Sequence, residues 1–173
     1  MKLIKELLKV YAVFVAIFFI GRVFFYLIYF DRLSDISLNE SLLTFIFGLR
    51  MDTIVISIIL VIPAIFLTLT PKIFSKFISK FLYFYILLFI VIALFIESAS
   101  FPFFAQYDLK PNYLFIEYLE YPKEVTSLLF KDYKLEFIFA TILIFLVSKI
   151  YLKLNFINFN KVFEQSYLSR ALL

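Results

Sequence analysis

The sequence predicts an all-helical protein that crosses a membrane four times. Four apolar stretches carry this prediction, at residues 10–30, 50–71, 81–97 and 135–152. Hydrophobic residues make up 64% of the chain and its mean hydropathy is +1.01, more apolar surface than a soluble domain of this size could bury. Each stretch approaches the ~20 helical residues that cross a hydrocarbon core of ~30 Å. We therefore expect a single transmembrane domain over residues 1–173.

The first two stretches each hold a distinguishing feature. Residues 10–30 carry one charge, Arg22, and follow a basic N-terminus, a pattern that a signal peptide shares. The stretch is too long for a signal peptide and no small-residue cleavage site follows it, so we interpret it as the first span. In the second stretch, Pro63 predicts a kink because proline removes one helix hydrogen bond.

The last two stretches are shorter and are bounded by charge. Residues 81–97 end at Glu97, and residues 135–152 include Glu136 and Lys149 near their two ends. To cross the bilayer, these spans must include flanking aromatic residues or let Lys149 extend its amine to the interface.

The distribution of lysine and arginine predicts the orientation, because basic loop residues resist translocation. The segments that we place in the cytoplasm hold Lys2, Lys5, Lys9, Lys72, Lys76, Lys80, Lys149, Lys153, Lys161 and Arg170. The connection at residues 31–42 holds Arg32 against Asp31, Asp35 and Glu40. Both termini are therefore expected in the cytoplasm, and the long connection at residues 98–134 outside.

Two connections are expected to be ordered. The lysines at 72, 76 and 80 share one face of a short helix over Pro71–Lys80, which suits the anionic surface of the cytoplasmic leaflet. Such a helix is either a topology anchor or a specific lipid site. In the outer connection, Pro122 in a first turn and an apolar face beginning at Val125 predict an amphipathic helix over residues 122–133.

Charges in or beside the spans are the main chemical signal, and all are predicted toward the outer leaflet. They are Arg22, Arg50, Asp52 and Glu97. Arg22 is eight residues from the predicted end at residue 30, or ~12 Å along a helix. Because residues two apart do not face each other, Arg50 and Asp52 should seek partners on other spans, as Arg22–Asp52 or Arg50–Glu97.

This group has two interpretations. Ion pairs between spans could simply orient the helices. Alternatively, Arg22 and Arg50 hold the phosphate of a phospholipid head group while a carboxylate faces any amine.

The composition lacks two residue types that carry much of enzyme chemistry. The sequence has no cysteine and no histidine, which removes thiolate chemistry and the commonest zinc ligand and general base. It has no glycine-rich phosphate loop and no nucleophile–base pairing. We expect no catalytic site, cofactor site or metal site, membrane phospholipids as partners, and no nucleic-acid partner.

Three short motifs resemble the membrane region of lipoteichoic acid synthase-like proteins, in the sulfatase and alkaline phosphatase superfamily. They are Phe47-Gly48-Leu49-Arg50-Met51-Asp52, the run from Tyr107-Asp108-Leu109-Lys110 to Tyr118, and Glu124-Val125. The resemblance covers residues 1–170. It implies a bacterial inner-membrane location and a function in transferring phosphoglycerol or a related head group.

Such proteins usually have five spans followed by an external catalytic domain that holds a metal ion and a Thr or Ser nucleophile. This chain has no such domain, so a divalent metal is implied only for that domain. The ending Ser169-Arg170-Ala171-Leu172-Leu173 is how a further span would begin. We therefore expect the membrane anchor and lipid-presenting domain of a head-group transferase, inactive alone. The alternatives are a small transporter or channel subunit and a structural membrane protein.

Overall fold

A computed structural model describes residues 2–33 and 37–171. Their helices are α1 (Lys2–Ile28), α2 (Phe30–Leu33), α3 (Leu38–Leu69), α4 (Ser75–Tyr107), α5 (Tyr113–Leu119), α6 (Pro122–Lys131), α7 (Lys134–Leu154) and α8 (Tyr167–Ala171). Two short 3-10 helices complete the order, η1 (Lys72–Phe74) and η2 (Phe159–Glu164). No strand occurs in the described ranges, so the predicted all-helical class is confirmed.

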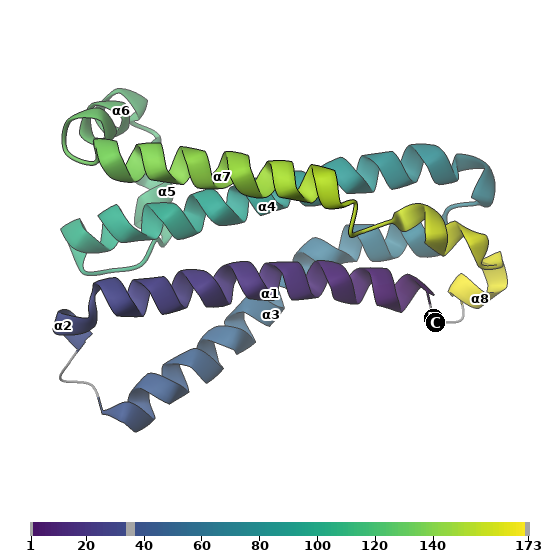
Figure 1. Ribbon diagram of the computed structural model, residues 1–173, viewed down its shortest axis with the longest axis horizontal. Helices are drawn as coiled ribbons and strands as arrows, with labels where there is room; N and C mark the ends of the chain where they lie inside the picture. The colour runs from purple at the N-terminus through teal and green to yellow at the C-terminus, as the bar shows by residue number, and fades with distance from the viewer. Residues whose placement is uncertain (1, 34–36, 172–173) are drawn as a thin grey trace.

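Four helices are long and apolar enough to cross a membrane, as predicted. α1 packs against α3 and α4, and α4 packs against α7. Figure 1 shows α1, α4 and α7 running side by side, while α3 crosses α1 and its first half diverges from the other spans. Both ends of the described chain lie at one end of the bundle, which we name the termini end; α2, α5 and α6 lie at the opposite end (Figure 1). Which end faces the cytoplasm stays a prediction.

The helices extend beyond the apolar stretches that predicted them. α3 begins twelve residues before residue 50, and α4 continues ten residues past Glu97. Apolar composition marks the part of a helix that contacts lipid, whereas internal hydrogen bonds continue for as long as the chain can make them. The start of α3 has a sequence signature that our prediction missed: the Ser37 hydroxyl accepts from the Glu40 backbone N–H, and the Glu40 carboxylate accepts from the Ser37 N–H. This capping box satisfies two otherwise unpaired donors.

The longer α4 changes both predicted connections. The separate helix over Pro71–Lys80 is wrong: Lys72–Phe74 form η1, and α4 begins at Ser75 and includes Lys76 and Lys80. At the other end, α4 reaches Tyr107, so the connection before α7 shortens and contains α5 and α6. A helix does lie at Pro122–Lys131, where residues 122–133 predicted one; the side chains of Leu128 and Leu129 on its expected apolar face lie outside the described residues.

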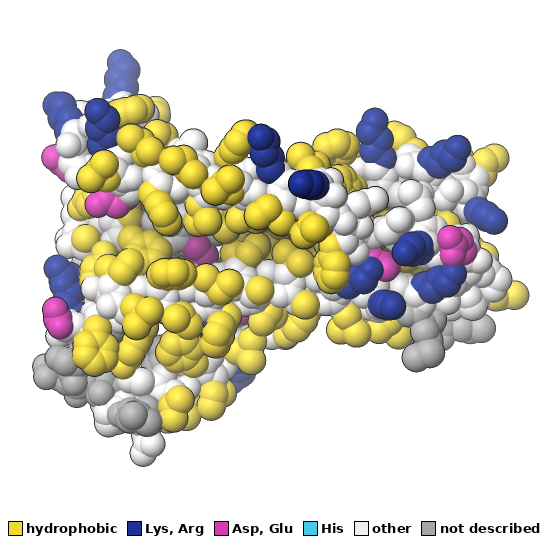
Figure 2. Space-filling model, viewed as in Figure 1, with side chains coloured by type: hydrophobic (Ala, Val, Ile, Leu, Met, Phe, Trp, Pro, Cys, Tyr) yellow, Lys and Arg dark blue, Asp and Glu magenta, His cyan; other side chains and the backbone are white. Residues whose placement is uncertain are grey.

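The surface of the long helices is apolar, as contact with lipid requires. Large apolar side chains remain exposed along the helices, for example Leu135 at 79% and Ile58 at 67%. Figure 2 shows hydrophobic side chains across the middle of the molecule and most Lys and Arg side chains toward its ends, above all the termini end. A bilayer around the middle would cover the apolar surface and leave the charges at its two interfaces.

Polar contacts join the N-terminal and C-terminal segments at the termini end. Glu6 is buried, pairs with Lys9 at 2.8 Å and accepts from the Asn158 backbone N–H at 2.9 Å. The Lys9 amine also donates to the Phe156 carbonyl at 2.9 Å. Lys2 pairs with Glu164. These contacts tie the start of α1 to the chain that follows α7.

Pro63 lies inside α3, and the structure identifies what compensates for its missing N–H. A proline has no N–H to donate to the carbonyl four residues earlier in a helix. In α3 that carbonyl belongs to Ile59. The Tyr85 hydroxyl of α4 donates to that carbonyl at 3.1 Å. A tyrosine on a neighbouring span thus replaces the hydrogen bond, and the compensation links α3 to α4.

We expect Tyr85→Phe to lower the free energy of unfolding by about 1 kcal/mol, because the Ile59 carbonyl would lose its donor in an apolar setting. Unfolding in mixed detergent micelles, followed by circular dichroism, measures the change. Tyr113→Phe is the matched control, since Tyr113 is 67% exposed and its hydroxyl has no hydrogen bond in the described structure. Equal stability of the two variants would contradict the role given to Tyr85.

Candidate functional site

An ion pair between α1 and α3 forms the centre of the candidate site. Arg22 Nη2 donates to both carboxylate oxygens of Asp52, at 2.9 Å to Oδ1 and 2.8 Å to Oδ2. Both side chains are only 13% exposed. The predicted Arg22–Asp52 pair is therefore confirmed.

The two glycines of the chain allow the charged groups to approach the helices closely. A Cβ added at Gly48 would overlap the Arg22 guanidinium, and a Cβ added at Gly21 would overlap the Glu97 carboxylate. Arg22 thus lies directly against the backbone of α3, and Glu97 of α4 lies against the backbone of α1. The sequence-based predictions assigned no function to these two glycines.

Lys110 joins the group from the connection that follows α4. Asp108 ends α4 in the left-handed conformation, with φ of 53°, and the chain turns there. The Lys110 amine then lies 4.6 Å from the centre of the Phe25 ring on α1. The Lys110 residue keeps exposed surface, but protein around its amine lowers its pKa below the usual lysine value, and the nearby Glu97 carboxylate opposes part of that shift.

Arg50 does not belong to this group. The charges that act on Glu97 are those of Lys110, Arg22 and Asp52. Arg50 is exposed and forms no ion pair with a described residue, so the alternative Arg50–Glu97 pair does not form. Arg50 lies apart because of helix geometry: Asp52 faces α1, and a residue two positions away on the same helix points in another direction.

We define the charged cluster as Arg22, Asp52, Glu97 and Lys110. Two cations and two carboxylates make it formally neutral. Arg22 Nη1 is buried and has no hydrogen-bond partner in the described part of the chain, and neither Glu97 nor Lys110 forms an ion pair there. The charged cluster thus contains polar groups that could still form hydrogen bonds with a ligand.

Asp52 and Glu97 lie further from the ends of their helices than the sequence predicted, whereas Arg22 lies slightly closer to the end of its helix. At ~1.5 Å per residue, Arg22 is ~9 Å from the end of α1, Glu97 is ~15 Å from the end of α4, and Asp52 is ~21 Å from the start of α3. The apolar stretch suggested that Asp52 lay near the start of its span. The early start of α3 instead places Asp52 close to the middle of that helix.

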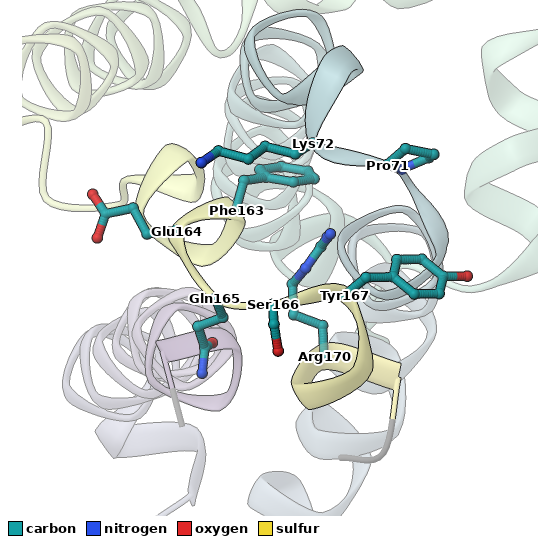
Figure 3. Close-up of a pocket in the computed structure, with 8 residues that line it drawn as sticks. All are labelled: Pro71, Lys72, Phe163, Glu164, Gln165, Ser166, Tyr167 and Arg170. Atoms are coloured by element: carbon teal, nitrogen blue, oxygen red, sulfur yellow. The ribbon is translucent and has the colours of Figure 1, made fainter.

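A second polar site lies at the termini end, and Figure 3 shows the side chains around it. It is a pocket of about 540 Å³ between the turn at Pro71–Lys72 and residues 163–167, with Arg170 at its base. Arg170 is 1% exposed and donates to the Leu67 and Thr70 carbonyls, at 2.7 and 3.1 Å. The Leu67 carbonyl belongs to the last turn of α3 and Thr70 is the C-cap of that helix, so neither carbonyl has a helical donor.

The ending that predicted a further span therefore contributes a buried side chain. Residues 167–171 form α8, and Leu172 and Leu173 lie outside the described residues. The Arg170 guanidinium also lies 4.8 Å from the centre of the Phe163 ring. Arg170 was expected only as a basic topology signal.

In the described ranges, no group of three or more His, Cys, Asp or Glu side chains could hold a metal ion. No protein-family model matches the sequence, and no solved structure matches the fold. The candidate function consequently depends on the residues themselves.

Proposed function

We propose that this chain is a membrane domain that binds a phospholipid head group at the charged cluster and presents it to a head-group transferase. One observation carries the proposal: two cations and two carboxylates meet where α1, α3 and α4 pack together, and three of these groups retain unused hydrogen-bonding capacity. Buried ionisable groups in membrane spans are costly and usually functional.

The charge pattern fits a head group that carries both a phosphate and an amine, such as phosphoethanolamine. The Lys110 amine and the free Nη1 of Arg22 would donate to the phosphate. Glu97 would accept from the amine. Asp52 would act as a positioning residue, since it holds Arg22 through two hydrogen bonds. A phosphoglycerol head group would use the same phosphate donors and leave Glu97 to accept from a hydroxyl.

Under this proposal the chain belongs in a bacterial cytoplasmic membrane, with both termini in the cytoplasm and the charged cluster toward the outer leaflet. Presentation would serve a catalytic domain, whether it continues this chain or is a separate partner, and a divalent metal would belong to that domain. The resemblance to lipoteichoic acid synthase-like proteins supports this assignment. Arg50 receives no ligand contact, because it lies apart from the charged cluster.

A transporter or channel subunit is the second candidate, and the position of Asp52 along α3 favours it. Asp52 lies close to the middle of α3, and an ion path needs charges well inside the bilayer. Loading vesicles with a pH-sensitive dye separates the two functions. Ion or proton flux that Asp52→Asn abolishes would support transport, whereas lipid binding without flux supports presentation.

Photo-crosslinking tests the lipid site. The full chain is placed in nanodiscs that contain a phosphatidylethanolamine with a photoreactive acyl chain, and the labelled fraction is measured by mass spectrometry. Lys110→Gln is expected to reduce labelling of α1 and α4 at least about tenfold, because one charge-assisted hydrogen bond contributes about 1.5–3 kcal/mol.

The matched control is Lys123→Gln, which removes another exposed lysine from the same connection, at α6. Labelling should remain at the wild-type level in this variant. Equal labelling of the Lys110 and Lys123 variants would show that Lys110 holds no head group and would overturn the proposed site.

A further inference from the structure

The pocket at the termini end has an excess of positive charge that the charged cluster does not have. Lys72 and Arg170 line it, and Lys2, Lys72 and Lys161 act on the one carboxylate of its lining, Glu164. The pocket and its edge thus hold four cations, Lys2, Lys72, Lys161 and Arg170, and its lining holds one carboxylate. Glu164 is also paired with Lys2, and Figure 3 shows its carboxylate pointing away from Arg170.

Arg170 gives this pocket a buried cation without a counter-ion. No carboxylate of the described residues pairs with it; its partners are two backbone carbonyls and the Phe163 and Tyr167 rings. Its Nε is buried and has no hydrogen-bond partner in that part of the chain. A buried cation without a paired anion is costly, so an anion entering the pocket would gain from a field that is already present.

We propose that this pocket binds the phosphate of an anionic phospholipid in the leaflet at the termini end. Lys72 would contact the phosphate from the exposed side of the pocket, and Arg170 would supply fixed positive charge from its base. This site is distinct from the charged cluster, and the inference does not depend on the proposed function.

The surroundings of the pocket favour a lipid over a soluble phosphate compound. Directly after Lys72, the side chains of Ile73, Phe74 and Phe77 are 85%, 57% and 72% exposed. Apolar side chains at the end of a span can enter the acyl region while a neighbouring lysine remains at the level of the head groups. The turn between α3 and α4 thus offers a lipid both a phosphate contact and an acyl contact.

The test uses the full chain in detergent micelles and measures the increase in its thermal midpoint as dihexanoyl-phosphatidylglycerol is added. Binding to the folded state raises the midpoint, and the titration yields Kd. We expect stabilisation by this lipid and none by dihexanoyl-phosphatidylcholine, which has no net charge. Glycerol phosphate, the head group without its tails, should have little effect.

Lys72→Gln should weaken binding of dihexanoyl-phosphatidylglycerol about tenfold or more, because it removes one charge-assisted hydrogen bond to the phosphate. Lys76→Gln is the matched control, because Lys76 is equally a lysine of this turn region, is exposed and does not line the pocket. Equal weakening by both substitutions would indicate general attraction to the surface and overturn the site. Equal stabilisation by glycerol phosphate and the lipid would overturn the assignment to a lipid.

Discussion

Arg22→Leu is expected to lower the free energy of unfolding by about 3–5 kcal/mol, the cost of removing one partner from a buried ion pair. Asp52 would lose the donor of both its side-chain hydrogen bonds, and two carboxylates, Asp52 and Glu97, would face Lys110 alone. The measurement is reversible unfolding in mixed detergent micelles, with helicity as the signal.

The double variant Arg22→Leu/Asp52→Leu makes this prediction specific. Replacing a whole buried pair by apolar residues is often neutral or stabilising, so the double variant should recover most of the loss. Arg50→Leu is the control for removing an arginine, and its exposed, unpaired side chain predicts a change within about 0.5 kcal/mol. If the double variant loses the sum of both single effects, the pair is not the stabilising unit that its geometry indicates.

Gly48→Ala should destabilise the protein by about 2 kcal/mol, although alanine is the better helix former by about 1 kcal/mol. The added Cβ would occupy the space of the Arg22 guanidinium. The guanidinium would have to move, and its hydrogen bonds to Asp52 would be lost. The cost of the broken pair then exceeds the gain in helix propensity.

Two comparisons test whether the Gly48 effect acts through Arg22. Gly21→Ala should cost less, within about 1 kcal/mol, because the Glu97 carboxylate that it displaces forms no ion pair in the described structure and can rotate away. In an Arg22→Leu background, Gly48→Ala should become neutral or stabilising, which the same unfolding measurement detects. A Gly48→Ala cost that is unchanged in that background would mean that the glycine serves another purpose.

Sequence reasoning located part of the candidate site and missed the remainder for identifiable reasons. It selected Arg22, Asp52 and Glu97 because charges in apolar spans are costly, and it anticipated the Arg22–Asp52 pair. It included Arg50 because Arg50 lies at the start of the second apolar stretch, but Asp52 faces α1 and Arg50 remains exposed on another side of α3. Lys110 was overlooked as a site residue because only the turn after Tyr107 brings the connection that follows α4 back over Phe25.

The pocket at the termini end could not be predicted, because its parts are distant in the chain. Arg170 reaches carbonyls at Leu67 and Thr70, about a hundred residues earlier. An unpaired carbonyl at a helix end is expected from any sequence, but which side chain satisfies it depends on how the chain returns after α7. The compensation of Pro63 by Tyr85 is similar, since the missing N–H is evident from the sequence and its replacement is not.

The amino-acid sequence by itself determined the helical class and the four membrane spans. A run of ~20 apolar residues is a local property of the chain, and in lipid such a run must form a helix to satisfy its backbone hydrogen bonds. The sequence also determined that buried charge must exist within this domain. Only the tertiary structure decided which charges meet, where the helices begin and end, and which backbone a charged group can approach. Those outcomes depend on the rotation and crossing of helices, and in lipid these follow from packing between specific side chains rather than from hydrophobicity.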